Sequence, residues 1–237
     1  MNEQQFQKAL KQHNLSLDKG QLEQFETYYH LLIEWNEKVN LTAITDQEEV
    51  YVKHFYDSLT PSFYEDFSNI ETLCDVGAGA GFPSIPLKIC YPHLKVTIID
   101  SLQKRIHFLE TLINELNLTN VNLVHGRAED IGQDRTYREK FDLVTARAVA
   151  RMNVLAEYCL PLCREEGLFI ALKGSAIAEE LTDGKRAIGQ LGGKLIRQVN
   201  FTLPEDEGER SLIWVKKVRK TAKQFPRKAG TPQRRPL

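Results

Sequence analysis

The sequence has no long apolar run and no apolar leader. Nothing in its 237 residues approaches the roughly 18 consecutive apolar residues that a membrane-spanning helix requires. The first residues, MNEQQFQKALKQ, also lack the apolar core of a secretory signal peptide. Apolar residues make up 42% of the chain and charged residues 27%, values typical of a globular protein. We therefore expect a cytoplasmic protein that does not enter the membrane.

Cysteine is scarce, and its spacing matches no metal or redox motif. None of the four cysteines belongs to a C-x-x-C pair, and Cys159 and Cys163 lie four residues apart among apolar neighbours. This pattern favours buried free thiols and no bound metal. No Ser-His-Asp or Cys-His arrangement stands out either, so the sequence offers no candidate for a covalent nucleophile.

Acidic residues are missing from the C-terminal end. Residues 216–237 contain nine Lys or Arg and no acid, whereas the rest of the chain holds 22 basic residues against 32 acidic ones. Prolines at three positions oppose helix formation there. We expect residues 219–237 to form a flexible or extended basic arm that contacts the phosphates of a polyanion. The alternative is a solvated tail that only aids solubility. The candidate phosphate contacts are Arg227, Lys228, Arg234 and Arg235.

Residues 1–65 predict a helical extension. Thr45, followed three residues later by Glu48, predicts a capping box that opens one of its helices. One apolar stripe at helical spacing consists of Leu22, Phe25, Tyr29, Leu32 and Trp35.

Residues 66–218 predict an α/β domain with a doubly wound sheet. Short apolar runs alternate with helical segments, which is typical of parallel strands covered on both faces. The last two runs are separated by EDEGE and no helix, so they predict an antiparallel hairpin that completes a seven-stranded sheet. The predicted strands are Thr72–Val76, Val96–Asp100, Val121–Val124, Phe141–Thr145, Leu168–Leu172, Leu195–Leu203 and Ser211–Val218.

A glycine-rich turn follows the first predicted strand in LCDVGAGAGFPSIP. Glycine permits positive φ and lets a ligand approach the backbone, so Gly77, Gly79 and Gly81 predict a nucleotide-like ligand. The dinucleotide motif GxGxxG requires its third glycine at position 82, and this sequence has Phe82 there. With Asp75 as the acid, the turn instead matches the (D/E)xGxGxG pattern of class I methyltransferases that use S-adenosylmethionine.

Two further signals follow the next two predicted strands. Asp100 ends the second strand, where a carboxylate accepts the ribose hydroxyls of an adenosine; capping the helix that begins at Leu102 is an alternative compatible with that role. After the third strand, Ala128 and Glu129 in VHGRAED place an amide and a carboxyl where the adenine amine donates.

Several segments resemble the RsmG family, also called glucose-inhibited division protein B. They are WNEKVNLTAIT, HFYDSL, DVGAGAGFPSIPLKI, HGRAED, FDLVTARAVA with the following LKG, and the ending RKAGTPQRRPL. The resemblance covers nearly the whole chain. It implies a class I methyltransferase fold with an N-terminal helical extension, and methyl transfer to N7 of one guanine of 16S ribosomal RNA in a loop near the decoding site. The cofactor contacts that it implies are Gly77, Phe82, Ala128, Glu129 and Arg147.

Guanine N7 carries a lone pair and no proton, so its methylation requires positioning rather than a general base. We therefore assign no catalytic residue. Arg147 and Lys173 follow the fourth and fifth strands and are the positioning candidates, and Lys173 and Arg151 are further candidates for contacts with RNA. The spacing of His54 and Asp57 places them on one helical face. Three roles stay open for this pair: to order a lid over the cofactor, to contact RNA, or to form a structural hydrogen bond between a helix and the sheet.

Three alternatives stay open. The same sheet serves nicotinamide-dependent oxidoreductases, non-catalytic RNA-binding proteins and small-molecule methyltransferases. For an RNA substrate, the sequence leaves open whether naked RNA, an assembly intermediate or the finished small subunit is bound, and which side chain stacks on the base. We expect a monomer.

Overall fold

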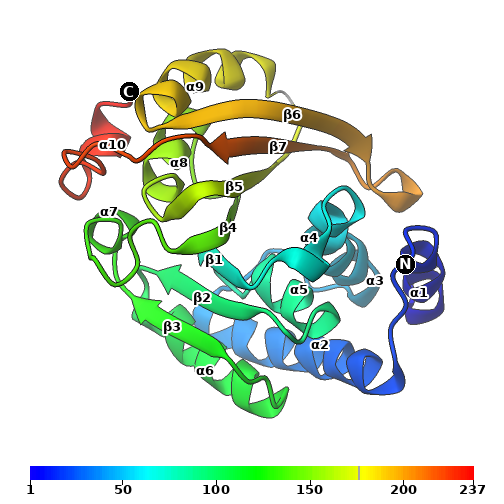
Figure 1. Cartoon of the computed structure of the whole chain (residues 1–237). Helices are drawn as coiled ribbons and strands as arrows, with labels where there is room; N and C mark the ends of the chain where they lie inside the picture. The colour runs from blue at the N-terminus through cyan, green and yellow to red at the C-terminus, as the bar shows by residue number, and fades with distance from the viewer. Residues whose placement is uncertain (176) are drawn as a thin grey trace.

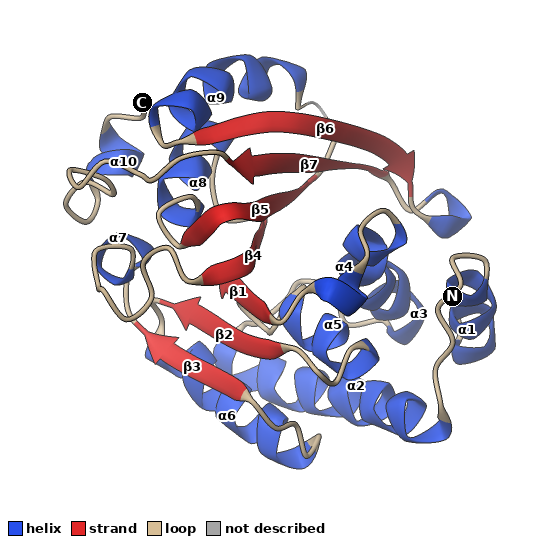
Figure 2. Ribbon diagram, in the orientation of Figure 1, coloured by secondary structure: helices blue, strands red, loops and turns tan. Residues whose placement is uncertain are grey.

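The computed structural model describes residues 1–175 and 177–237. One seven-stranded sheet runs through the molecule in the order β3-β2-β1-β4-β5-β7-β6, with β7 antiparallel to both of its neighbours (Figures 1 and 2). The predicted α/β class, the seven strands and the antiparallel last strand are therefore confirmed. The strands are β1 (Thr72–Val76), β2 (Lys95–Asp100), β3 (Val121–His125), β4 (Phe141–Arg147), β5 (Cys163–Lys173), β6 (Gly193–Thr202) and β7 (Glu209–Lys217).

Helices cover both faces of the sheet because the strands carry apolar side chains on both sides. In β1, Leu73 points into one hydrophobic core and Cys74 into the other, as successive residues of a strand must. The N-terminal helices, α5 (Ser84–Cys90) and α6 (Gln103–Glu115) pack on the first face; α8 (Met152–Cys159) and α9 (Ala178–Gln190) pack on the second (Figure 1).

The other helices include the 21-residue helix α2 (Lys19–Val39) of the N-terminal extension and several short ones. The structure gives no helix among the described residues that is long and apolar enough to cross a membrane, and no cluster of three or more potential metal ligands among the same residues. All four cysteines are buried free thiols, as predicted. The remaining helices are α1 (Glu3–Lys11), α2 (Lys19–Val39), α3 (Gln47–Val50), the π-helix η1 (Tyr51–Tyr56), α4 (Asp57–Leu59), the 3-10 helices η2 (Thr60–Phe63), η3 (Phe67–Asn69) and η4 (Pro204–Asp206), α7 (Ala128–Ile131) and α10 (Thr231–Arg234).

The N-terminal helices differ in two details from the prediction. Helix α2 buries Tyr28 rather than its neighbour Tyr29. The cap of α3 is Asp46, whose carboxylate accepts from the backbone N–H of Glu49, so the capping box expected at Thr45 is wrong and the cap lies one residue later. A carboxylate satisfies a free helix N–H as well as a hydroxyl does, which explains the shift.

The expectation of a flexible or extended arm at residues 219–237 is wrong. The segment folds against α7, α8 and the loop that precedes β4 (Figure 1). Arg138 donates from its guanidinium to the carbonyl oxygens of Thr221 and Phe225, at 2.8 and 2.7 Å, and the ring of Phe225 is buried in the second core. We call residues 219–237 the strap.

Arg227 is the main polar anchor of the strap and is not free to bind a phosphate. Its guanidinium donates to both carboxylate oxygens of Glu157, which is fully buried in α8, and its backbone N–H donates to the same carboxylate. Because its charge is paired with a buried carboxylate, we do not propose Arg227 as an RNA contact. Lys228, Arg234 and Arg235 are exposed and stay predictions.

Replacing Arg227 by alanine leaves the Glu157 carboxylate buried without its cation. We expect Arg227→Ala to lower the free energy of unfolding by about 3 kcal/mol, measured by urea denaturation. The matched control, Arg234→Ala, removes an exposed arginine of the same segment and changes the stability by about 0.5 kcal/mol or less. Equal stability of the two variants would contradict the anchoring role of Arg227.

Candidate functional site

The glycine turn between β1 and α5 has one side open to a ligand. Gly79 has φ of 60°, and a Cβ built on it would meet no atom within 4 Å. A ligand can therefore lie directly against its backbone. Gly81 has φ of 99°, but a Cβ there would lie 2.8 Å from both Ile85 and the hydroxyl of Tyr28. Gly81 is thus required by packing, and its contact with a cofactor stays a prediction.

Asp75 supports the turn from behind. Its carboxylate is fully buried, accepts from the backbone N–H of Ser84 at 3.0 Å, and lines none of the cavities described below. Burial raises the pKa of Asp75 to about 7. The side chain of Asp75 holds the start of α5, and its contact with a cofactor stays a prediction.

The largest cavity at the site, of about 490 Å³, lies beyond the carboxyl ends of the first strands; we call it the β2 cavity. Asp100 lines it at the end of β2 and is 2% exposed. Its two carboxylate oxygens accept from the backbone N–H groups of Gly79 and Leu102. Leu102 is itself the N-cap of α6 and no side chain caps that helix, so the capping role considered for Asp100 is wrong. The oxygen that accepts from Gly79 also lies 3.5 Å from the Arg105 guanidinium, and the oxygen that accepts from Leu102 retains a second lone pair for a ligand hydroxyl.

The far wall of the β2 cavity comes from α7 and the strap. Ala128 and Glu129 line it, as does Gln233 of α10. The carboxylate of Glu129 is 3% exposed and accepts from the backbone N–H of Gly230 at 2.7 Å. Part of the acceptor capacity that the sequence assigns to the adenine amine is therefore used by the strap.

A smaller cavity, of about 190 Å³, continues across the glycine turn; we call it the glycine-turn cavity. It shares Gly77, Arg105 and Ala148 with the β2 cavity, so the two form one trough. Ala148 has φ of 56°, in the left-handed region that non-glycine residues seldom adopt. Such strain collects at functional sites.

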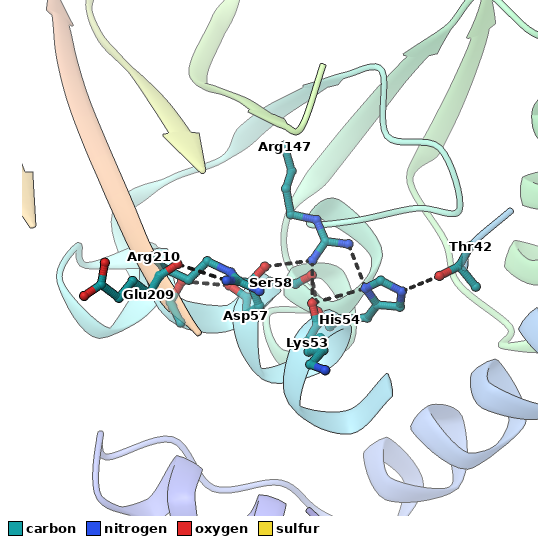
Figure 3. A network of polar contacts seen from close by, with 9 residues as sticks. Thr42, Lys53, His54, Asp57, Ser58, Arg147, Glu209 and Arg210 are labelled. Carbon is teal, nitrogen blue, oxygen red and sulfur yellow. Dashed lines mark hydrogen bonds and ion pairs between the residues drawn. The ribbon is translucent and has the colours of Figure 1, made fainter. Parts of the chain in front are cut away.

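Arg147 closes the trough at the end of β4. Its guanidinium donates to the Asp57 carboxylate at 2.9 Å and to the carbonyl oxygen of Lys53 at 3.1 Å (Figure 3). Arg210 from β7 lies 3.2 Å from the other oxygen of Asp57. Figure 3 shows these groups meeting between the helical extension and the strand ends. Asp57 is 6% exposed, and its charge is matched by two cations.

His54 completes this network and is held neutral. Nδ1 lies 3.1 Å from the carbonyl oxygen of Lys53 and 3.3 Å from the Arg147 guanidinium, and Nε2 lies 2.7 Å from the Thr42 hydroxyl. Burial, reinforced by the Arg147 charge, lowers the pKa of His54 to about 3. Of the roles considered for His54 and Asp57, the structure supports the bridge between helix and sheet.

Phe82 fixes the helical extension to the glycine turn. Its ring stacks on His54 at 4.6 Å and on Tyr28 at 5.3 Å between centroids, and the Arg147 guanidinium lies 4.7 Å from its centre. Tyr28 also donates to the carbonyl oxygen of Ala80 at 2.6 Å. These contacts hold the turn in the shape that leaves Gly79 open.

A third cavity, of about 350 Å³, opens on the other side of Arg147; we call it the β5 cavity. Lys173 lines it and is restrained by the carbonyl oxygen of Ala150 and by the Glu180 carboxylate. The four-residue spacing predicts that Arg151 faces this site beside Arg147, and the structure does not place it there. It is 64% exposed and pairs with Asp183 on α9, because the chain turns at Ala148.

The family of the chain follows from two comparisons. A family model described as rRNA small subunit methyltransferase G matches residues 21–211. Two relatives named ribosomal RNA small subunit methyltransferase G come from Exiguobacterium sibiricum and Bacillus pumilus. They are 60% and 57% identical over 237 residues, covering 100% of this chain and 100% and 99% of theirs. The chain belongs to this family.

Solved structures of other methyltransferases share the fold. An O-methyltransferase from Bacillus cereus in complex with SAH aligns with a TM-score of 0.56 at 16% identity, over 80% of this chain and 90% of that chain. M. jannaschii TYW2 in complex with AdoMet aligns with a TM-score of 0.51 at 18% identity, over 68% and 74%. The class I methyltransferase fold is thus confirmed. Membership of a methyltransferase family supports S-adenosylmethionine as the cofactor and sets the oxidoreductase alternative aside.

The residues of the trough fit this cofactor. The buried Asp100 carboxylate suits the ribose hydroxyls, the open backbone at Gly79 suits close approach, and the Arg147 guanidinium suits the carboxylate of the amino-acid part. The predicted residues that line the three cavities are Gly77, Gly79, Phe82, Asp100, Ala128, Glu129, Arg147 and Lys173; their contacts with ligands stay predictions.

The sequence analysis missed several residues of the site, among them Arg105, Arg210 and Gln233. Arg210 is the second residue of the last strand, and Gln233 lies in the family-like ending RKAGTPQRRPL, which the sequence analysis linked to RNA and not to this cavity. Their positions depend on a hairpin and a strap whose docking no local pattern reports.

Two glycine substitutions separate ligand contact from packing. Gly79→Ala adds a methyl group where a ligand would lie, so we expect the affinity for S-adenosylhomocysteine to fall at least about tenfold, with a loss of stability of about 1–2 kcal/mol from the positive φ. Gly81→Ala clashes with Ile85 and Tyr28, so its stability falls by more than about 2 kcal/mol. Calorimetric titration and urea denaturation measure the two effects; unchanged affinity in Gly79→Ala would contradict the assignment.

Proposed function

We propose that this protein transfers a methyl group from S-adenosylmethionine to N7 of one guanine of 16S ribosomal RNA, in the loop near the decoding site. Its membership of the rRNA small subunit methyltransferase G family supports an RNA substrate of the small subunit. The observation that carries the choice of N7 is that no described side chain lining the β5 cavity is free to accept a proton.

Each titratable group in that cavity is engaged elsewhere. His54 has a pKa of about 3 and both of its nitrogens are in contact with neighbours, so it stays neutral and does not take a proton near neutral pH. Both Asp57 oxygens face arginines. Ion pairs with Glu207 and Glu49 raise the pKa of Lys53 and keep it charged.

A nucleophile without a proton fits such a cavity. An exocyclic amine or a ribose hydroxyl loses a proton on methylation and requires a base. Guanine N7 already presents a lone pair in the plane of the base, so the enzyme has only to position it. Bound S-adenosylmethionine supplies an electrophilic methyl group on its sulfonium. Lys173 and Arg210 face the same cavity and can donate to the O6 acceptor beside N7.

The RNA backbone requires cations outside the cavities. Lys228, Arg234 and Arg235 are exposed on the strap at the same edge of the sheet, and Arg151 is exposed at the start of α8. We propose that these four residues contact phosphates, with an affinity that falls as salt rises. Ribosomal RNA or a particle of the small subunit is the substrate.

The product and the pH profile together test the proposal. RNA from cells without the protein is incubated with the protein and methyl-labelled cofactor, and reduction followed by aniline cleaves the chain at 7-methylguanosine. We expect cleavage at one guanine and, at saturating cofactor, a kcat that is constant from about pH 7.5 to 8.5, above the pKa of about 7 of Asp75, because no described group that lines the β5 cavity takes a proton in the reaction. Label at an exocyclic amine or a ribose, or a kcat that falls as the pH is lowered within this range, would contradict it. Absence of transfer would favour a non-catalytic RNA-binding protein.

A further inference from the structure

The strap supplies one wall of the cofactor site. Among the described residues of the strap, Gln233 is the one that lines the β2 cavity, opposite the end of β2 where Asp100 lies. Figure 1 shows α10, which carries Gln233, beside α7 and α8 and on the far side of the molecule from the N-terminus. A segment that looks like a polyanion-binding tail therefore reaches the pocket for adenosine.

Two anchors hold Gln233 in place. Gly230, three residues earlier, donates its backbone N–H to Glu129 at 2.7 Å, and Arg227 pairs with the buried Glu157. Pro232, directly before Gln233, is buried against the domain. Glu129 follows the loop at the end of β3, so the strap is bonded to the element that lines the adenine end of the cavity.

The side chain of Gln233 has unused hydrogen-bonding capacity. In the part of the chain that the structure describes, its amide makes no hydrogen bond, although it borders a cavity with polar walls. A glutamine amide offers a donor and an acceptor side by side. The edge of adenine offers the complement, an amine that donates and a ring nitrogen that accepts, and glutamine is a preferred partner of that edge.

We propose that Gln233 reads the adenine edge of S-adenosylmethionine and makes the strap a specificity element of the cofactor site. Its amide oxygen accepts from the adenine amine, its amide nitrogen donates to a ring nitrogen, and the Gly230–Glu129 bond positions it. The inference rests on the cofactor and not on the choice of guanine N7.

The experiment exchanges hydrogen-bond donors and acceptors both in the side chain at position 233 and on the base of the ligand. Calorimetry gives the affinities for S-adenosylhomocysteine and for S-inosylhomocysteine, in which a carbonyl oxygen replaces the amine. Gln233→Glu only accepts, so we expect the adenosyl-to-inosyl affinity ratio to rise at least about fivefold over that of the unchanged protein. Gln233→Lys only donates and lowers the ratio by a similar factor. Gln224→Glu and Gln224→Lys alter an exposed glutamine of the same strap and leave the ratio unchanged.

A purely structural role of Gln233 cannot shift the adenosyl-to-inosyl affinity ratio in opposite directions in the two variants, because misfolding lowers the affinity for both ligands alike. The same ratio in the unchanged protein and in both Gln233 variants overturns the proposal. Failure of the unchanged protein to bind either ligand overturns it together with the cofactor assignment. Since no RNA is present, a methyl transferred to another RNA atom would leave this result standing.

Discussion

The rest of the site depends on two ion pairs, which the nearly buried carboxylate of Asp57 makes with Arg147 and Arg210. Asp57 belongs to the helical extension, Arg147 ends β4 and Arg210 lies near the start of β7, so one anion joins three parts of the chain that are far apart in sequence. A carboxylate buried to this degree is tolerated only when its charge is paired. The pair also limits Arg147 to one orientation, beside the Phe82 ring at the junction of the glycine-turn and β5 cavities. The extension is therefore part of the site rather than an appendage to the sheet.

The buried acidic residues around the trough each hold a different part of the structure in place. Asp75 is sealed behind the glycine turn and fixes α5, whereas Asp100 reaches the cavity while its oxygens hold the turn and Leu102. Glu157 and Glu129 hold the strap. With His54 kept neutral, the site has cations and fixed dipoles but no available base. This composition suits a reaction whose main requirement is the placement of two reacting atoms.

Local patterns predict the sheet, the glycine turn and the position of Asp100, because each of these features depends on the types and spacing of a few neighbouring residues. The strap is different: Arg227 meets Glu157 70 positions away, and Gly230 meets Glu129 101 positions away. A basic, proline-containing segment has the composition of a free arm, and only the distant partners reveal that it is docked. Asp75 and Gly81 show a second limit, since the motif identifies the turn but does not say which of its members face the ligand and which face the core. Tyr28 and Tyr29 show a third, because adjacent positions on α2 differ by only part of a turn.

The central claim is that the three adjoining cavities form one site, with adenosine bound between Asp100 and the strap and the amino-acid part bound across Gly79 toward Arg147. A crystal structure of the protein with S-adenosylhomocysteine tests this most directly. The account predicts ribose hydroxyls within hydrogen-bonding distance of Asp100, adenine against Ala128 and Gln233, and the sulfur facing the β5 cavity. Electron density for the ligand outside the trough, or with its sulfur turned away from the β5 cavity, would contradict the account.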